Sequence, residues 1–140
     1  MEQETVNEIE KRCNNIKTAL SETLKWRRDD RFELLLAEFK IENIEKVTAV
    51  LATELEQKWD AKTISSASKD IQKINKQLGG LRDAQLLYTA NINSKVILLC
   101  AWWPWGNNQN VSIRVGLKSL DNKLLSEINT TVNIPAIFGL

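Results

Sequence analysis

Two carboxylates and a lysine flank a short apolar run, at a spacing that could support metal-assisted hydrolysis. Asp29 or Asp30 precedes the run Leu34–Ala37, and Glu38 and Lys40 follow it. If the run is a strand, carboxylates on adjoining strands can hold Mg²⁺, and the lysine can support the attacking water. This chemistry needs no histidine, and the 140-residue chain contains none.

This order of residues resembles the Asp…Glu-x-Lys arrangement of restriction-endonuclease-like nucleases. By that resemblance Asp30 and Glu38 would be the metal ligands, and Lys40 would be the lysine beside the water. The resemblance covers residues 29–40 and requires residues 33–41 to form a strand. A metal-dependent nuclease is therefore one alternative for this chain.

The same segment also has a helical pattern, which we favour. Its apolar residues recur at steps that place them on one face of a helix, and leucine, alanine and glutamate are good helix formers. The residues on that face are Phe32, Leu35, Leu36 and Phe39. We predict a helix over residues 32–39, which would remove the basis for a metal site between strands.

Three tryptophans beside an amide-rich loop form a candidate binding site. Trp102 and Trp103 end an apolar run, and Trp105, Asn107 and Asn108 follow it. In a strand Trp102 and Trp103 point to opposite faces, so both are buried only if both faces are covered. An uncovered face would offer an indole to a protein partner, a membrane surface or a nucleic-acid base. Burial of the rings in the core is the alternative.

A stripe of lysines is a further candidate. Lys69, Lys73 and Lys76 lie on one side of a predicted helix and could follow a phosphate backbone. Residues 1–60 carry 10 basic and 14 acidic side chains, a charge of −4, and residues 61–140 carry 9 and 4, a charge of +5. The stripe could therefore also contact the acidic half of the chain, or simply be solvated.

Composition excludes several classes of function. Without histidine there is no Ser-His-Asp or Cys-His centre and no zinc site that needs imidazole. A net charge of +1 gives no general attraction to nucleic acid or to an anionic membrane. Cys13 and Cys100 stand at apolar positions, and we expect two buried free thiols, with a disulfide or a reactive thiol as alternatives. The polar, acidic start and the absence of a long apolar segment predict a cytoplasmic location.

Long amphipathic helices are predicted over residues 3–27, 41–61 and 64–78. The first has an apolar stripe that could pack within the domain or form a short coiled-coil seam in a homodimer. The residues that keep its seven-residue register are Val6, Ile9, Cys13, Ile16 and Leu20. Ser65, Ser66 and Ser68 are possible N-caps of the last helix, and Gly79-Gly80 ends it.

A β-hairpin is predicted over residues 95–118, where a continuous apolar run precedes an alternating one. Residues 84–92 predict a weaker first strand, joined to the hairpin by a tight turn over residues 91–94. A short helix should begin after Ser119 and end near Thr130, and residues 132–140 should pack back on the domain.

These observations predict an α+β fold in one domain, residues 1–140. We expect it to be mainly helical over residues 1–80, followed over residues 84–140 by a three-stranded antiparallel meander and a short C-terminal helix. The favoured function is a non-enzymatic protein–protein interaction module that self-associates as a homodimer. We expect a protein partner and no cofactor. A nucleic-acid-binding protein and a peripheral membrane protein are further alternatives.

Overall fold

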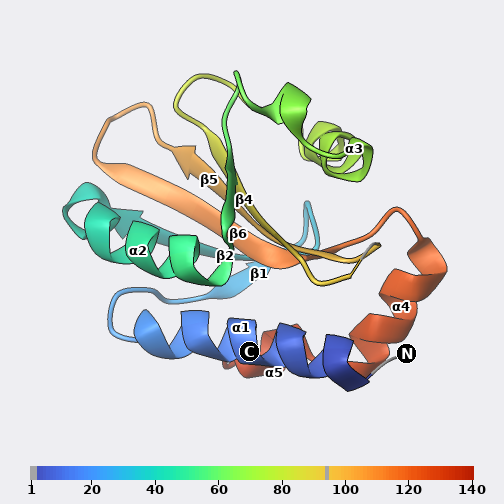
Figure 1. The fold of residues 1–140 in the computed structure, drawn as a ribbon. Coiled ribbons are helices and arrows are strands. Elements are labelled where there is room, and N and C mark those ends of the chain that lie inside the picture. The colour runs from blue at the N-terminus through green and yellow to red at the C-terminus, as the bar shows by residue number, and fades with distance from the viewer. Residues whose placement is uncertain (1–2, 94) are drawn as a thin grey trace.

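The computed structural model describes residues 3–93 and 95–140, which form an α+β fold around one antiparallel sheet (Figure 1). Within those residues the sheet has six strands in the order β1-β2-β6-β5-β4-β3. Along the chain they are β1 (Arg27–Asp29), β2 (Leu34–Lys40), β3 (Gln57–Trp59), β4 (Leu86–Asn91), β5 (Ile97–Pro104) and β6 (Asn110–Lys118). The helices are α1 (Gln3–Ala19), α2 (Ile44–Glu54), α3 (Lys69–Gln77), α4 (Asn122–Thr131) and α5 (Ile134–Ile137), with short 3₁₀ turns η1 (Ile41–Asn43) and η2 (Ile64–Ser66).

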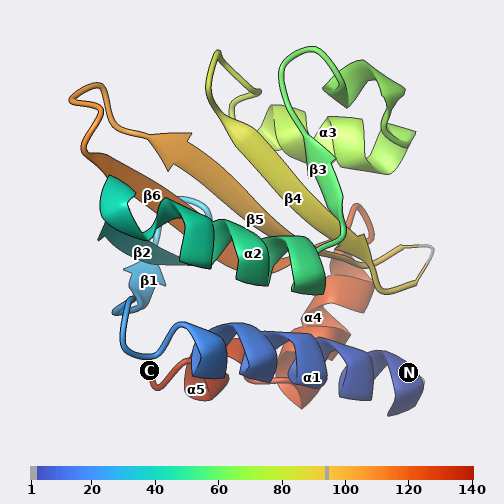
Figure 2. The same ribbon diagram turned by 60° about the vertical axis from the view of Figure 1, so that its left-hand side comes forward.

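Helices cover the two faces of the sheet unequally. Figures 1 and 2 show α1, α2 and α5 on one side and α3 on the other, above one end of the strands. We call these the α1 side and the α3 side. Because successive side chains of a strand alternate, the register assigns every strand residue to one side.

The α1 side holds the larger hydrophobic core. Alternate residues of each long strand point into it, and the apolar stripe of α1 and residues of α2 pack against them. The strand residues are Leu35, Ala37, Phe39, Tyr88, Ala90, Leu98, Cys100, Trp102, Val111, Ile113, Val115 and Leu117. The stripe residues of α1, such as Ile9 and Ile16, are fully buried here. A homodimer would therefore need a different surface from this stripe.

On the α3 side, a smaller cluster lies beneath α3. Ile71 and Ile74 of the helix pack with Leu87, Ile97 and Leu99 of the sheet. Ser68 caps the helix by accepting a hydrogen bond from the Ile71 N–H (3.3 Å). Beyond α3, Gly79 and Gly80 both have positive φ, which confirms the predicted helix end.

The prediction of a mainly helical fold with a three-stranded meander is wrong. Residues 34–40 are strand β2, paired on one side with β1 and on the other with β6. Leu34 through Ala37 are all buried, since β2 lies inside the sheet with apolar neighbours on both faces. Burial on both faces overrides the helix propensity of leucine and alanine, and a continuous apolar run is what such a strand needs.

The three long helices are shorter than their apolar stripes suggest, and the one predicted over residues 64–78 begins only at Lys69. The helix predicted over residues 3–27 ends at Ala19, and that predicted over residues 41–61 ends at Glu54. Trp59 continues the second stripe in the sequence but belongs to β3, where its indole N–H donates to Thr89 Oγ1 (2.9 Å). After α1 the stripe continues into the same core through Leu20 and Leu24, whereas Trp59 packs on the opposite side of the sheet, in the cluster beneath α3.

The hairpin predicted over residues 95–118 is confirmed as β5 and β6, with Trp103 opposite Ser112. The strand predicted over residues 84–92 is confirmed as β4. In the predicted turn, Asn93 Oδ1 accepts from the N–H groups of Lys95 and Val96, whereas Ser94 lies outside the described residues.

The C-terminal helix begins at Asn122, with Asp121 as its N-cap. Ser119 accepts from the Asp121 N–H instead of capping the helix itself. The tail packs back as predicted, through Val132, Ile134 and Phe138.

Gly116 is a tight position in the sheet. It lies opposite Leu99, and a Cβ there would come within 2.5 Å of Leu34 Cδ2. We predict that Gly116→Ala lowers the free energy of unfolding by about 1 kcal/mol, because the buried Leu34 side chain has to shift. Thermal unfolding should show a drop of a few degrees. Gly106→Ala is the control, since a Cβ at Gly106 meets nothing within 4 Å. Equal stability of the two variants would contradict this prediction.

Candidate protein-binding face

Beyond the reach of α3, the α3 side of the sheet is covered by side chains of the sheet and of the β1–β2 turn rather than by a helix. The cluster under α3 reaches Leu99 on β5, whereas Trp103, four residues further along the same face, is half-buried. Cross-strand neighbours place Ser112 beside Trp103, and Arg27 and Arg114 on either side of Leu36. We call this region the open face. It consists of Arg27, Glu38, Trp103, Trp105, Ser112 and Arg114.

A stacked cation and an ion pair form the centre of the open face. The Arg114 guanidinium carbon lies 4.4 Å from the centroid of the Trp103 ring. Its Nε donates to Asp29 Oδ2 (2.5 Å), and both side chains are largely buried, 16% and 10% exposed. Phe32 packs edge-on against Trp103, with the ring centroids 5.5 Å apart. Arg114 is thus held by a carboxylate and an aromatic ring together, which fixes its orientation.

A second ion pair lies at the margin of the open face. Arg27 donates to Glu38 across the β1–β2 hairpin. The Arg27 side chain is mostly exposed, so solvent screens this pair and it adds little to stability. Its position matters more than its strength, because it places opposite charges side by side at an accessible edge.

Trp105 extends the aromatic surface at the end of β5. It is 41% exposed, and its indole N–H donates to Ser112 Oγ (2.7 Å), which ties the ring to the open face. The loop that follows is shaped by its own amides. Asn107 Oδ1 accepts from the Gln109 N–H, and Asn108 adopts a positive φ of 58°. These two asparagines therefore have roles in the turn itself.

The three tryptophans selected from the sequence divide between the two sides of the sheet. Trp102 is 5% exposed and packs edge-on with Phe39 in the α1-side core, 5.4 Å between centroids. Trp103 and Trp105 belong to the open face. The alternation rule therefore separates the adjacent tryptophans as expected, and one of them meets a face that no helix covers.

The lysine stripe lies apart from the tryptophans. Lys69, Lys73 and Lys76 are exposed on the outer surface of α3, while Ile71 and Ile74 of the same helix face the sheet. No lysine of this stripe makes an ion pair within residues 3–93 and 95–140. The stripe and the open face are therefore separate surfaces.

The residues of the nuclease resemblance are not brought together. The strand that the resemblance requires is present as β2, but Glu38 lies near one end of the β1–β2 hairpin and Asp30 follows β1 at the turn end. Glu38 is paired with Arg27. Among the described residues there is also no group of three or more His, Cys, Asp or Glu side chains that could hold a metal ion.

Arg27, Phe32 and Arg114 have no marker in the sequence that assigns them to a site. Arg114 stands on the polar face of an alternating strand, which is a usual place for a charged residue. Asp29, its partner, is separated from it by 85 positions. No local spacing links two residues so far apart, so the pair becomes visible only in the folded chain.

No protein-family model, no curated protein and no solved structure matches the chain. In the part of the chain that the structure describes, no helix is both long enough and apolar enough to cross a membrane.

We predict that Asp29→Asn destabilises the protein by about 2 kcal/mol, because it removes one partner of a largely buried ion pair. Urea unfolding would measure the loss. Asp30→Asn, on the exposed neighbouring residue, is the control and should leave the free energy of unfolding nearly unchanged. A similar, small effect of both changes would show that the Asp29–Arg114 pair does not hold the open face.

The two cysteines are free and buried, as predicted. Burial, with a smaller contribution from Glu10, raises the pKa of Cys13 to about 12. Burial also raises the pKa of Cys100. A raised thiol pKa leaves almost no reactive thiolate at neutral pH.

We therefore predict that neither thiol reacts with a disulfide reagent in the folded protein at pH 8, and that both react once guanidinium chloride unfolds it. A Ser66→Cys variant supplies an exposed thiol as the positive control. Rapid reaction of native Cys13 or Cys100 would contradict the prediction.

Proposed function

We propose that this protein is a non-enzymatic interaction module that binds a second copy of itself through the open face. The observation that carries the proposal is the aromatic surface that no helix covers in the described part of the chain, with Trp105 41% exposed beside the half-buried Trp103. Tryptophan and arginine are the residues that most often dominate protein interfaces. A single uncovered sheet face that presents both types favours a protein partner.

The arrangement of charge favours protein over nucleic acid as the partner. Both arginines of the open face are already paired with carboxylates, Arg27 with Glu38 and Arg114 with Asp29. A phosphate backbone would meet these carboxylates at close range. One face of the Trp103 ring is also occupied by the Arg114 guanidinium, which leaves less of that ring for a stacked base.

The balance of charge favours a second copy of the chain. An isologous interface brings the same patch from both copies together, so residue i meets j and j meets i. The two arginines and two carboxylates of this region cancel, and each cation lies beside an anion. Such a patch can meet its own copy with opposite charges facing each other.

The first test is the dissociation constant of the dimer, measured by sedimentation equilibrium over the micromolar range. We predict that the wild-type chain dimerises and that Trp105→Ala weakens dimerisation about tenfold or more, because it removes an exposed aromatic anchor. Leu140→Ala is the matched control, since Leu140 has nearly the same exposure (42%) and does not belong to the open face. A strict monomer, or a dimer indifferent to Trp105→Ala, would overturn the proposal.

Charge exchange supplies a sharper form of the same test. Arg27→Glu and Glu38→Arg should each weaken the dimer by placing like charges together, and the double exchange should restore it. Equal dimerisation by all four chains would place the interface elsewhere. In the same buffer, salt-sensitive binding of a labelled single-stranded oligonucleotide that is lost in Trp105→Ala would replace the protein partner with nucleic acid.

A further inference from the structure

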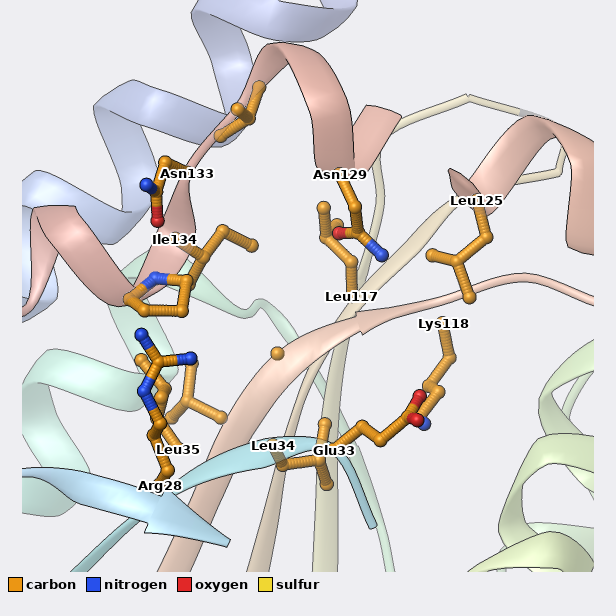
Figure 3. Close-up of a pocket in the computed structure, with 14 residues that line it drawn as sticks. Arg28, Glu33, Leu34, Leu35, Leu117, Lys118, Leu125, Asn129, Asn133 and Ile134 are labelled. Carbon is orange, nitrogen blue, oxygen red and sulfur yellow. The ribbon is translucent and has the colours of Figure 1, made fainter. Parts of the chain in front are cut away.

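A cavity of about 380 Å³ lies between the β1–β2 hairpin, the end of β6 and the two C-terminal helices (Figure 3). Leu117, Leu125 and Ile134 contribute to its apolar wall, and Arg28, Lys118 and Asn129 contribute polar groups. The volume lies at the lower end of the range for small-molecule sites, roughly 300–1,000 Å³. Its lining comes from segments distant in the sequence, so the fold itself builds the cavity.

The cavity exists because α4 does not pack flat on the sheet. Ile128 of α4 is buried, whereas Leu125 is half-buried. After α4 the backbone is extended at Val132 and then enters α5, with Pro135 in its first turn. The two helices therefore bridge the end of β6 and leave space beneath them.

The polar groups that line the cavity differ in how many hydrogen-bond and ion-pair partners they have. Within residues 3–93 and 95–140, the Arg28 guanidinium makes no ion pair, and it points toward α5 at the margin of the cavity (Figure 3). Lys118 Nζ donates one hydrogen bond to the Phe32 carbonyl (2.8 Å) and keeps two further donors. Glu33 also lines the cavity, so its lining carries two positive charges and one negative charge; Lys118, opposite Ile97, approaches from the α3 side of the sheet and Arg28 from the α1 side.

We propose that this cavity binds a small carboxylate with an aliphatic tail. The carboxylate accepts hydrogen bonds from Arg28, whose planar fork matches its two oxygens. The tail lies against Leu117, Leu125 and Ile134. A single negative charge fits better than a phosphate, because Glu33 would repel a dianion in a site whose net charge is only one.

This inference stands apart from the proposed function. Arg27 and Arg28 are adjacent in β1 and point to opposite sides of the sheet, so the cavity and the open face share no arginine. Loss of carboxylate binding would leave the dimer intact, and loss of the dimer would leave carboxylate binding intact. The two proposals can therefore fail separately.

The test is titration calorimetry of the full chain with butanoate, hexanoate and octanoate, with octanamide as the neutral analogue. Affinity should rise about fourfold for each added methylene until the cavity is full, because each buried CH₂ contributes a similar amount. Octanamide should bind at least about tenfold more weakly than octanoate, because it lacks the charge that Arg28 recognises. Equal binding of octanoate and octanamide would overturn the proposal.

Two variants locate the site. Arg28→Gln should weaken octanoate binding about tenfold or more, whereas Arg31→Gln, on the same hairpin but outside the cavity, should not. Asn129→Trp starts from an exposed position and fills the cavity, so it should abolish binding while circular dichroism stays native. Equal binding by the Arg28 and Arg31 variants, or full binding by Asn129→Trp, would place octanoate elsewhere and overturn the proposal.

Discussion

The structure depends on one constraint: a single sheet is apolar on both faces, but helices cover one face much more fully than the other. The central strand β5 buries Leu98 and Cys100 on the α1 side and Ile97 and Leu99 on the α3 side. A helix of nine residues is about 14 Å long, whereas a strand of eight residues runs about 27 Å. Even laid along the strand, α3 would therefore cover only about half of that face. The remainder has to be covered by its own side chains or by a partner.

The open face can contact water although it is not polar throughout. Arg114 carries charge into it, and both its carboxylate partner and an indole ring hold the guanidinium in place. Trp105 reaches back to Ser112 and so shields part of the sheet while exposing its own ring. A surface of this kind satisfies its buried polar groups internally, which lowers the desolvation that binding would require. This pairing of polar groups distinguishes the open face from an exposed patch made only of apolar side chains.

An element of the fold can be predicted from the sequence when neighbouring residues determine it, and not when contacts between distant residues determine it. The β5–β6 hairpin and the caps of α3 follow from short patterns, a turn composition and a serine before a helix, and these predictions hold. Strand β2 does not follow from a short pattern. Leucine and alanine favour a helix, and the segment becomes a strand only because neighbouring strands bury both of its faces. The sequence correctly separates Trp102 from Trp103, but which of them stays accessible depends on where α3 lies. The Asp29–Arg114 pair joins positions too far apart for any spacing to suggest.

Strand β1, with only three residues, contributes side chains to both of these surfaces, the open face and the cavity. In β1, three consecutive residues alternate between the two sides of the sheet, so Arg27 and Asp29 contribute to the α3 side while Arg28 turns to the cavity below α4 and α5. Charged residues on a short edge strand also discourage edge-to-edge pairing with other sheets. Because the strand has a free outer edge, it can carry three charges without burying any of them unpaired. The charged composition of β1 thus follows from its position at the edge of the sheet. The same position lets β1 contribute side chains both to the open face and to the cavity.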